Sequence, residues 1–138
     1  MMLVLLDTNV VLDYLLDRAP FAEDAAAIWD AGERGEVGLF VAAITPLNLY
    51  YVARKLKGAA VARQLVASLL KACRVCTLDQ TILLAAQTAT MSDFEDAVQA
   101  VRGEFFGLDA LVTRNTTDFE NSAVQVLTAS EMARLLSE

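Results

Sequence analysis

Short apolar runs alternate along the chain with longer segments of helical periodicity. The apolar runs are nearly continuous, which is typical of strands buried on both faces of a parallel sheet. We expect strands at residues 3–6, 39–43, 74–78, 110–113 and 124–127. We expect helices at residues 9–17, 21–35, 46–57, 59–72, 80–88, 93–102 and from 129 onward. This alternation predicts one α/β domain over residues 1–138, a three-layer α/β/α sandwich around a parallel sheet of four to five strands.

Capping signals mark three of these helix starts. Thr45 is expected to cap a helix whose first residue is Pro46. The segments Ser92–Glu95 and Thr128–Glu131 have the capping-box form, a Ser or Thr followed three residues later by Glu. We therefore interpret Glu95 as a capping residue rather than a ligand.

Polar residues follow two of the predicted strands at the point where each strand ends. Asp7, Thr8 and Asn9 follow the first strand, and residues 113–118 (Thr-Arg-Asn-Thr-Thr-Asp) follow the fourth. Sites in open parallel sheets form outside the carboxyl ends of the strands, and the helix start near Asp93 could face the same edge. A carboxylate at the end of a buried strand needs a cation or hydrogen-bond donors to compensate its desolvation. Several together predict Mg²⁺ or Mn²⁺, which take oxygen ligands.

The composition narrows the chemistry. The chain has no histidine, which excludes Ser-His-Asp and Cys-His catalysis and histidine acid–base catalysis. Its two cysteines, Cys73 and Cys76, have no further cysteine or histidine with which to form a zinc site, so we expect them to be packing residues. Carboxylates, hydroxyls, Lys or Arg must therefore carry any chemistry, and we expect a metal to assist them.

The net charge of −7 is unevenly distributed. Residues 37–78 contain six basic residues and no Asp or Glu, whereas the rest of the chain has 18 acidic and 5 basic residues. This asymmetry favours a basic surface beside an acidic one, although a solvated helical face would have the same composition. Phosphate binding needs only a local patch, for which Arg54, Lys55 and Arg63 are the candidates.

Four motifs together resemble the PIN-domain ribonucleases, in particular the VapC-like toxins. They are residues 5–10 (Leu-Leu-Asp-Thr-Asn-Val), 93–97 (Asp-Phe-Glu-Asp-Ala), 111–119 (Leu-Val-Thr-Arg-Asn-Thr-Thr-Asp-Phe) and 124–131 (Val-Gln-Val-Leu-Thr-Ala-Ser-Glu). Each motif alone has low specificity, but all four occur in order across nearly the whole chain. The resemblance implies Mg²⁺- or Mn²⁺-dependent hydrolysis of phosphodiester bonds in single-stranded RNA. It also implies the toxin of a toxin–antitoxin pair, held in check by a cognate antitoxin.

The resemblance assigns catalytic and metal-binding roles to particular acidic positions. Asp7 matches the family's first metal carboxylate, and Asp96 matches the third, the Asp of an Asp-Ala pair. Asp118 or Asn115 occupies the fourth position. The structural alternatives are a helix cap for Asp7, a solvated helix surface for Asp96 and a turn for Asp118.

The chain departs from the family pattern at Asn48, where many members have Glu. An amide oxygen can bind a metal but adds no charge, so we expect a weakened site. Asp93, three residues before Asp96, is expected to replace part of that charge, unless it only favours the helix start. Asn9 and Thr113 resemble the residues that orient the carboxylates.

Two other functions stay open. The same fold with a weakened site could bind RNA or a partner without cleaving. A phosphate-receiving signalling domain also groups acids at strand ends, but it would need a Lys after a late strand, and no Lys follows Lys71.

Apolar stretches bear on location and assembly. The longest, residues 37–53, is interrupted by polar residues and divides into a strand and a helix, so no membrane span is expected. The N-terminal apolar run has no basic residue and is short for a signal peptide, so we expect a cytoplasmic protein. Apolar helices such as residues 59–72 favour a homodimer.

Overall fold

The computed structural model describes residues 1–91, 93–119 and 122–138, and in these residues five strands form one parallel sheet. The strands are β1 (Met2–Leu6), β2 (Val37–Ala42), β3 (Arg74–Cys76), β4 (Ala110–Val112) and β5 (Gln125–Leu127). Their order is β3-β2-β1-β4-β5, and all neighbouring pairs are parallel. The chain adds β2 and β3 on one side of β1 and then crosses over to add β4 and β5 on the other. The direction of sheet growth therefore reverses at β1.

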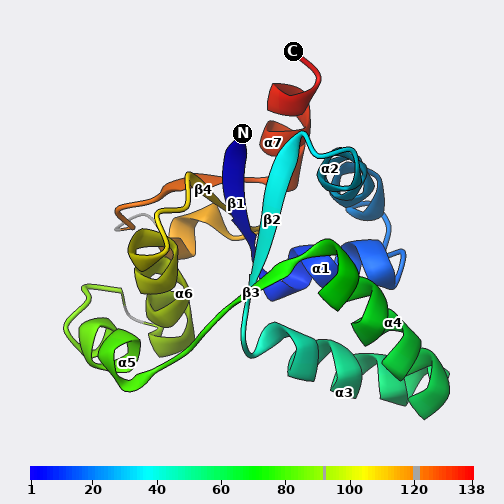
Figure 1. The fold of residues 1–138 in the computed structure, drawn as a ribbon, viewed down its shortest axis with the longest axis horizontal. Coiled ribbons are helices and arrows are strands. Elements are labelled where there is room, and N and C mark those ends of the chain that lie inside the picture. The colour runs from blue at the N-terminus through cyan, green and yellow to red at the C-terminus, as the bar shows by residue number, and fades with distance from the viewer. Residues whose placement is uncertain (92, 120–121) are drawn as a thin grey trace.

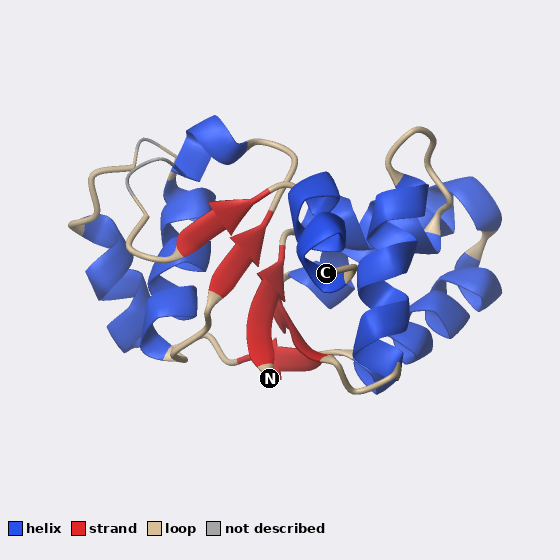
Figure 2. Ribbon diagram, turned by 90° about the horizontal axis from the view of Figure 1, so that it is seen from above, coloured by secondary structure: helices blue, strands red, loops and turns tan. Residues whose placement is uncertain are grey.

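Helices cover both faces of the sheet (Figure 1 and Figure 2). One face carries α1 (Thr8–Leu15), α2 (Ala22–Glu33), α3 (Thr45–Lys57), α4 (Ala59–Ala72) and α7 (Ala129–Leu136). The other face carries α5 (Gln80–Gln87) and α6 (Phe94–Phe105), and a short 3₁₀ turn, η1 (Thr116–Phe119), follows β4. The predicted three-layer α/β/α sandwich is confirmed, with element ends shifted by at most three residues.

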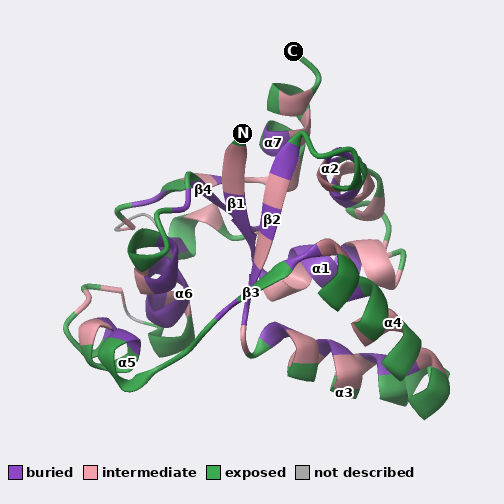
Figure 3. Ribbon diagram, in the orientation of Figure 1, coloured by how far each residue is buried: buried purple, intermediate pink, exposed green. Residues whose placement is uncertain are grey.

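The side chains of β1 alternate between two hydrophobic clusters. Val4 and Leu6 pack with the helices of the larger face, whereas Leu5 packs toward α6 and η1. Figure 3 shows the burial on the strands and on the helix surfaces that face them. Within the described residues, none of the helices is long and apolar enough to span a membrane.

The two cysteines separate into these clusters, Cys73 in the larger and Cys76 in the other. Both thiols are free, and burial raises the pKa of Cys73 to about 12 and that of Cys76 to about 11. Both cysteines are therefore packing residues, as expected, and they lie in different clusters.

The start of α3 differs from the prediction. Thr45 is the first residue of the helix and not its cap, and Ile44 occupies the cap position without a side-chain hydrogen bond. Thr45 is fully buried, and its hydroxyl lies 2.9 Å from the hydroxyl of Thr8. A hydrogen bond to α1 thus takes the place of the predicted cap.

The start of α6 also differs. The predicted cap Ser92 lies outside the described residues, and Asp93 caps the helix by accepting a hydrogen bond from the backbone N–H of Asp96. The prediction that Glu95 is the capping partner is therefore wrong, because Asp96 occupies that position. The capping box of α7, formed by Thr128 and Glu131, is confirmed.

Candidate active site

Asp7 follows β1 and caps α1 with its side chain. Asp7 is 9% exposed, and its carboxylate accepts three hydrogen bonds. Oδ1 accepts from the backbone N–H of Thr8 at 2.8 Å and from Nε2 of Gln99 at 3.1 Å. Oδ2 accepts from the hydroxyl of Thr113 at 2.8 Å. These donors compensate the desolvation of the carboxylate and fix its orientation.

The pairing of β1 with β4 brings Asp7 and Thr113 together. Leu6 pairs with Val112 in parallel register, so the next residue of each strand emerges at the same edge of the sheet. The backbone N–H of Asp7 also donates to the carbonyl of Val112 at 2.9 Å. This edge lies where sheet growth reverses, and ligands of open parallel sheets bind at such points.

The amino-terminal end of α6 supplies further acidic groups. Asp93 caps the helix, and Asp96 is partly buried one turn later. Burial raises the pKa of Asp96 to about 6, with further contributions from the nearby charges of Asp93, Asp7, Asp118 and Glu95. Asp7 and Asp96 also line the same pocket, so the structure brings the two carboxylates together.

One pocket of about 340 Å³ collects these carboxylates. Its described lining contains five carboxylates and no Lys or Arg. The lining residues are Asp7, Thr8, Asn9, Leu12, Asn48, Val52, Asp93, Glu95, Asp96, Gln99, Asn115, Asp118 and Phe119. Uncompensated like charges in one pocket repel, so a bound cation would stabilise this arrangement.

The sequence model of the PIN domain family matches residues 3–117 of the chain. This chain belongs to the PIN domain family. No curated protein sequence matches it.

Solved structures with the same fold include VapBC proteins, a toxin–antitoxin complex and a cleaving toxin. One is a DNA-bound VapBC from Salmonella typhimurium, with 19% identity, a TM-score of 0.70, and coverage of 94% of this chain and 99% of that chain. A toxin–antitoxin complex from Klebsiella pneumoniae has 22% identity, a TM-score of 0.67, and coverage of 91% and 97%. Mycobacterium tuberculosis VapC20, a sarcin–ricin loop cleaving toxin, has 13% identity, a TM-score of 0.63, and coverage of 87% and 93%. At these identities the likeness shows a shared fold.

The pocket of this PIN domain offers the ligand types that Mg²⁺ and Mn²⁺ prefer, carboxylate and amide oxygens. Gln99 contributes a buried Oε1 that has no hydrogen-bond partner among the described residues. In the same residues, however, no group of three or more acidic or thiol side chains is arranged to hold an ion as it stands. The donor chemistry thus fits a divalent cation, and the carboxylates would have to turn toward a common point to bind it.

The polar residues predicted to support the carboxylates behave differently from one another. Thr113 is fully buried and bonds directly to Asp7. Asn48 and Asn9 line the pocket from α3 and α1. Asn9, however, accepts hydrogen bonds from Arg18 through its carbonyl at 3.3 Å and its side-chain oxygen at 3.5 Å. In the described hydrogen bonds, therefore, Asn9 does not orient a carboxylate.

The predicted RNA-binding residues do not line the pocket. Arg54 and Lys55 are exposed in the last turns of α3, and Arg63 is exposed on α4. Lys55 lies two turns after Asn48 and shares its helical face, so it continues outward from the pocket. Arg63 instead lines a groove of about 540 Å³ between α3 and α4. The three residues therefore do not form one patch at the pocket mouth.

A buried ion cluster beside the pocket escaped the sequence analysis. Asp13 on α1 is 2% exposed and accepts from Nε of Arg18 at 3.0 Å and from Nε and Nη2 of Arg114. The Arg114 guanidinium also lies 4.1 Å from the ring centre of Phe21. This cluster holds the segment after β4 against α1 and α2. The sequence gives one indication of this cluster. Asp13 directly follows the apolar run Val10–Leu12 in a predicted helix, which suggests that it is buried.

Gln99 was also missed. It is 2% exposed, one turn after Asp96 on α6, and bonds to Asp7. Its spacing from Asp96 on the predicted helix was the available signal.

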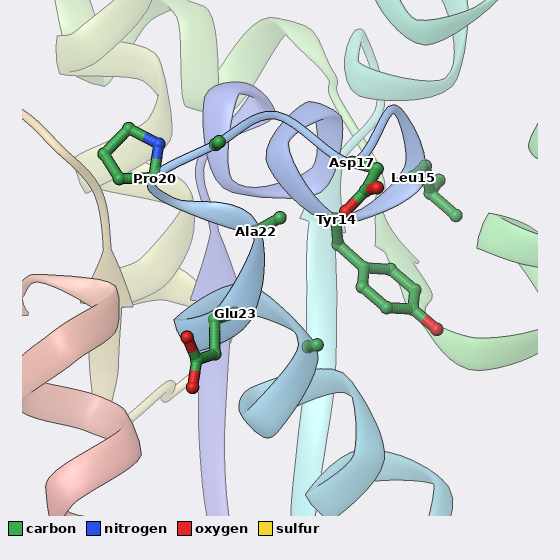
Figure 4. A pocket seen from close by; sticks show the side chains of 8 residues that line it. Tyr14, Leu15, Asp17, Pro20, Ala22 and Glu23 are labelled. Atoms are coloured by element: carbon green, nitrogen blue, oxygen red, sulfur yellow. The ribbon is translucent and has the colours of Figure 1, made fainter.

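A larger pocket of about 590 Å³ lies between α1 and α2 (Figure 4). Its lining contains the carboxylates of Asp17 and Glu23 but none of the groups that bond to Asp7. We therefore assign the chemistry to the smaller, more acidic pocket.

Proposed function

We propose that this PIN domain is an endoribonuclease that uses Mg²⁺ or Mn²⁺ to hydrolyse phosphodiester bonds of single-stranded RNA. The observation that carries the proposal is the acidic pocket at the carboxyl ends of β1 and β4. The fold supports it, since VapC20, which shares that fold, is a sarcin–ricin loop cleaving toxin.

In this proposal Asp7, Asp96 and Asp118 hold the cation, with Asn115 and Asp93 as further oxygen ligands. A bound divalent cation activates water and neutralises negative charge on the phosphate. The chain's own contribution is to hold the carboxylates in place through fixed hydrogen-bond donors to Asp7. The neutral side chain at Asn48 reduces the negative charge available and so weakens cation binding.

The basic stretch between residues 37 and 78 supports an RNA substrate. Its six basic side chains are all exposed, so they can attract phosphates without reading the sequence. They are Arg54, Lys55, Lys57, Arg63, Lys71 and Arg74. Lys55 would bind the phosphate nearest the pocket, because it shares a helical face with Asn48, and Arg54 and Arg63 would bind more distant ones.

The test is cleavage of a labelled single-stranded RNA with Mg²⁺, Mn²⁺ or a chelator. Asp7→Asn keeps a capping residue at the start of α1 but removes the charge, and we expect it to lose roughly 100-fold or more in activity. Asp30→Asn, at an exposed position on α2, is the matched control and should cleave like the wild type. A wild type that cleaves with none of these metals contradicts the proposal. So does an Asp7→Asn variant with full activity.

We also propose a cognate antitoxin as partner, because the solved structures of this fold include VapBC and toxin–antitoxin complexes. Induction of the protein in a bacterial host should arrest growth, and co-expression of a small protein encoded next to it should restore growth. Normal growth on induction of a verified active protein would argue against a toxin.

A homodimer is proposed from exposed apolar side chains on α3 and α4. Leu47, Tyr51, Leu56 and Leu70 are 52–66% exposed, which is unusual for so many large apolar groups on two adjacent helices. Sedimentation should give a dimer for the wild type and a monomer for Leu56→Glu. A monomeric wild type at micromolar concentration would reject this assembly.

The alternative function is a binding module that holds RNA without cleaving it. Asn48 in the pocket favours it, because an amide replaces a charged ligand there. Asn48→Glu distinguishes the two functions. Strong cleavage by this variant but not by the wild type would indicate a binding module, whereas comparable cleavage by both would support the nuclease.

A further inference from the structure

Gln99 has an unusual position in the acidic pocket. Its side chain is 2% exposed, it lines the pocket, and its Nε2 donates to Asp7 at 3.1 Å. An ionised carboxylate can only accept hydrogen bonds, so the amide nitrogen must face Asp7. The amide oxygen, Oε1, is therefore directed away from Asp7.

This oxygen is buried and has no donor among the described residues. A buried acceptor left without a donor costs about 1–3 kcal/mol, and such groups in native proteins usually meet an ordered water. The described lining also contains groups that could donate, the hydroxyl of Thr8 and the amides of three asparagines, but none of them bonds to this oxygen. An ordered water is the donor that such a buried acceptor usually meets.

We propose that Gln99 positions the water that attacks the phosphate, by accepting one of its O–H groups at Oε1. This inference rests on the proposed hydrolysis. The second O–H of the same water points to a pocket carboxylate, so one lone pair of the water oxygen remains directed at the substrate. Gln99 thus has two tasks, since its nitrogen holds Asp7 and its oxygen holds the nucleophile.

The reaction balances without proton exchange at Gln99. The water oxygen forms a bond to phosphorus, and the bond from phosphorus to the leaving ribose oxygen breaks with its electron pair on that oxygen. A pocket carboxylate takes one proton from the water, and the leaving oxygen receives a proton from solvent. The amide only sets the direction of attack.

Gln99→Leu removes both hydrogen bonds with little change in volume. We expect kcat to fall by about 100-fold with KM nearly unchanged, because misdirected attack affects the reacting atoms and not RNA binding. The imidazole of Gln99→His can offer one donor and one acceptor in a side chain of similar size. This variant should therefore recover part of the kcat lost in Gln99→Leu. Gln99→Met serves as the second variant if Gln99→Leu does not fold.

Thr113→Val is the comparator, because it removes another donor to Asp7 and leaves Oε1 untouched. If Gln99 only holds Asp7, then Gln99→Leu and Thr113→Val should lose kcat by similar factors. Thr113 also accepts a hydrogen bond from the backbone N–H of Asn115, so Thr113→Val loses more than its bond to Asp7. This extra loss makes it harder for Gln99→Leu to show the larger effect. A Gln99→Leu loss no larger than that of Thr113→Val overturns the inference.

A readout independent of activity is a crystal structure at a resolution that orders water. The wild type should hold a water within hydrogen-bond distance of Oε1, and Gln99→Leu should lose it while Asp7 stays in place. A wild-type structure without that water overturns the inference. A wild type that cleaves no RNA refutes the proposed function instead, so the two failures are distinguishable.

Discussion

Replacing Asp13 with Asn tests whether the buried ion cluster stabilises the site-bearing segment. Asp13 is 2% exposed and accepts hydrogen bonds from two guanidinium groups, those of Arg18 and Arg114. The Asn side chain has nearly the same shape but no charge and only one acceptor oxygen. The substitution therefore leaves two arginines side by side without a counter-charge.

Breaking a buried ion pair by removing one partner costs about 3–5 kcal/mol. The Arg18 and Arg114 side chains are 34% and 30% exposed, so solvent screens part of the charge left behind. We therefore expect Asp13→Asn to lower the free energy of unfolding by about 3 kcal/mol. For 138 residues this lowers the melting temperature by about 10 °C.

The two arginines should differ. Arg114 makes two hydrogen bonds to Asp13 and lies over the ring of Phe21. Arg18 makes one hydrogen bond to Asp13 and two longer ones to Asn9, at 3.3 and 3.5 Å. Arg114→Gln should therefore destabilise by about 2 kcal/mol and Arg18→Gln by about 1 kcal/mol. Arg114→Gln should also reduce RNA cleavage more, because it lies in the segment that carries Thr113.

Urea unfolding followed by the fluorescence of Trp29 measures these changes. Trp29 is the single tryptophan, is buried, and stacks on Tyr14 at 4.6 Å between ring centres, so its emission reports the loss of packing. Asp13→Asn within about 0.5 kcal/mol of the wild type would refute the reasoning. An Arg18→Gln variant less stable than Arg114→Gln would refute the assigned order.

Three further predictions follow from burial and charge. Mn²⁺ should raise the melting temperature more at about pH 7.5 than at about pH 5, because Asp96, with its pKa raised to about 6, must lose its proton to bind a cation. Without metal, the raised pKa of Asp96 makes the protein lose stability as pH rises through 6. An equal Mn²⁺ effect at both pH values would contradict the proposed role of Asp96 as a metal ligand. Neither Cys73 nor Cys76 should react with a thiol reagent at about pH 8 in the folded protein, and both should react in urea; rapid labelling of native protein would contradict their burial. Two guanidinium nitrogens of Arg102 are buried without a partner among the described residues. Arg102→Met should therefore raise the free energy of unfolding in urea by roughly 1–3 kcal/mol. A lower free energy of unfolding would show that the charge of Arg102 is compensated.

The elements and the edge that carries the site could be predicted from local pattern. Residues 3–6 are wholly apolar, and Asp7 marks the point where burial ends. Parallel strands place their carboxyl ends at one edge, so Asp7 and the segment after β4 had to meet there. Four of the five acidic residues of the pocket were therefore found from sequence spacing and resemblance, and Glu95 was not.

The supporting contacts could not be predicted, because their partners are distant in the sequence. Gln99 bonds to Asp7 across 92 positions, and Arg114 bonds to Asp13 across 101. Nothing local to Gln99 or Asp13 indicates these partners. The helix start at Asp93 was missed for a different reason, since Ser and Asp are both good caps and stand next to each other.

The shift of the α6 cap from Ser92 to Asp93 changes where the acidic side chains of the site lie on the helix. Because Asp93 is the cap, Asp96 occupies the position whose N–H meets the cap, at the positively polarised end of α6. Asp7 stands at the corresponding end of α1, so two helix starts direct their N–H groups toward the same acidic pocket. Capping and the proposed metal binding thus use carboxylates at the same edge of the sheet. This explains how the chain can fold around five carboxylates with no basic residue in the described lining of the pocket. It also explains why Asp7→Asn should abolish the proposed activity but keep the fold, because Asn can still cap α1.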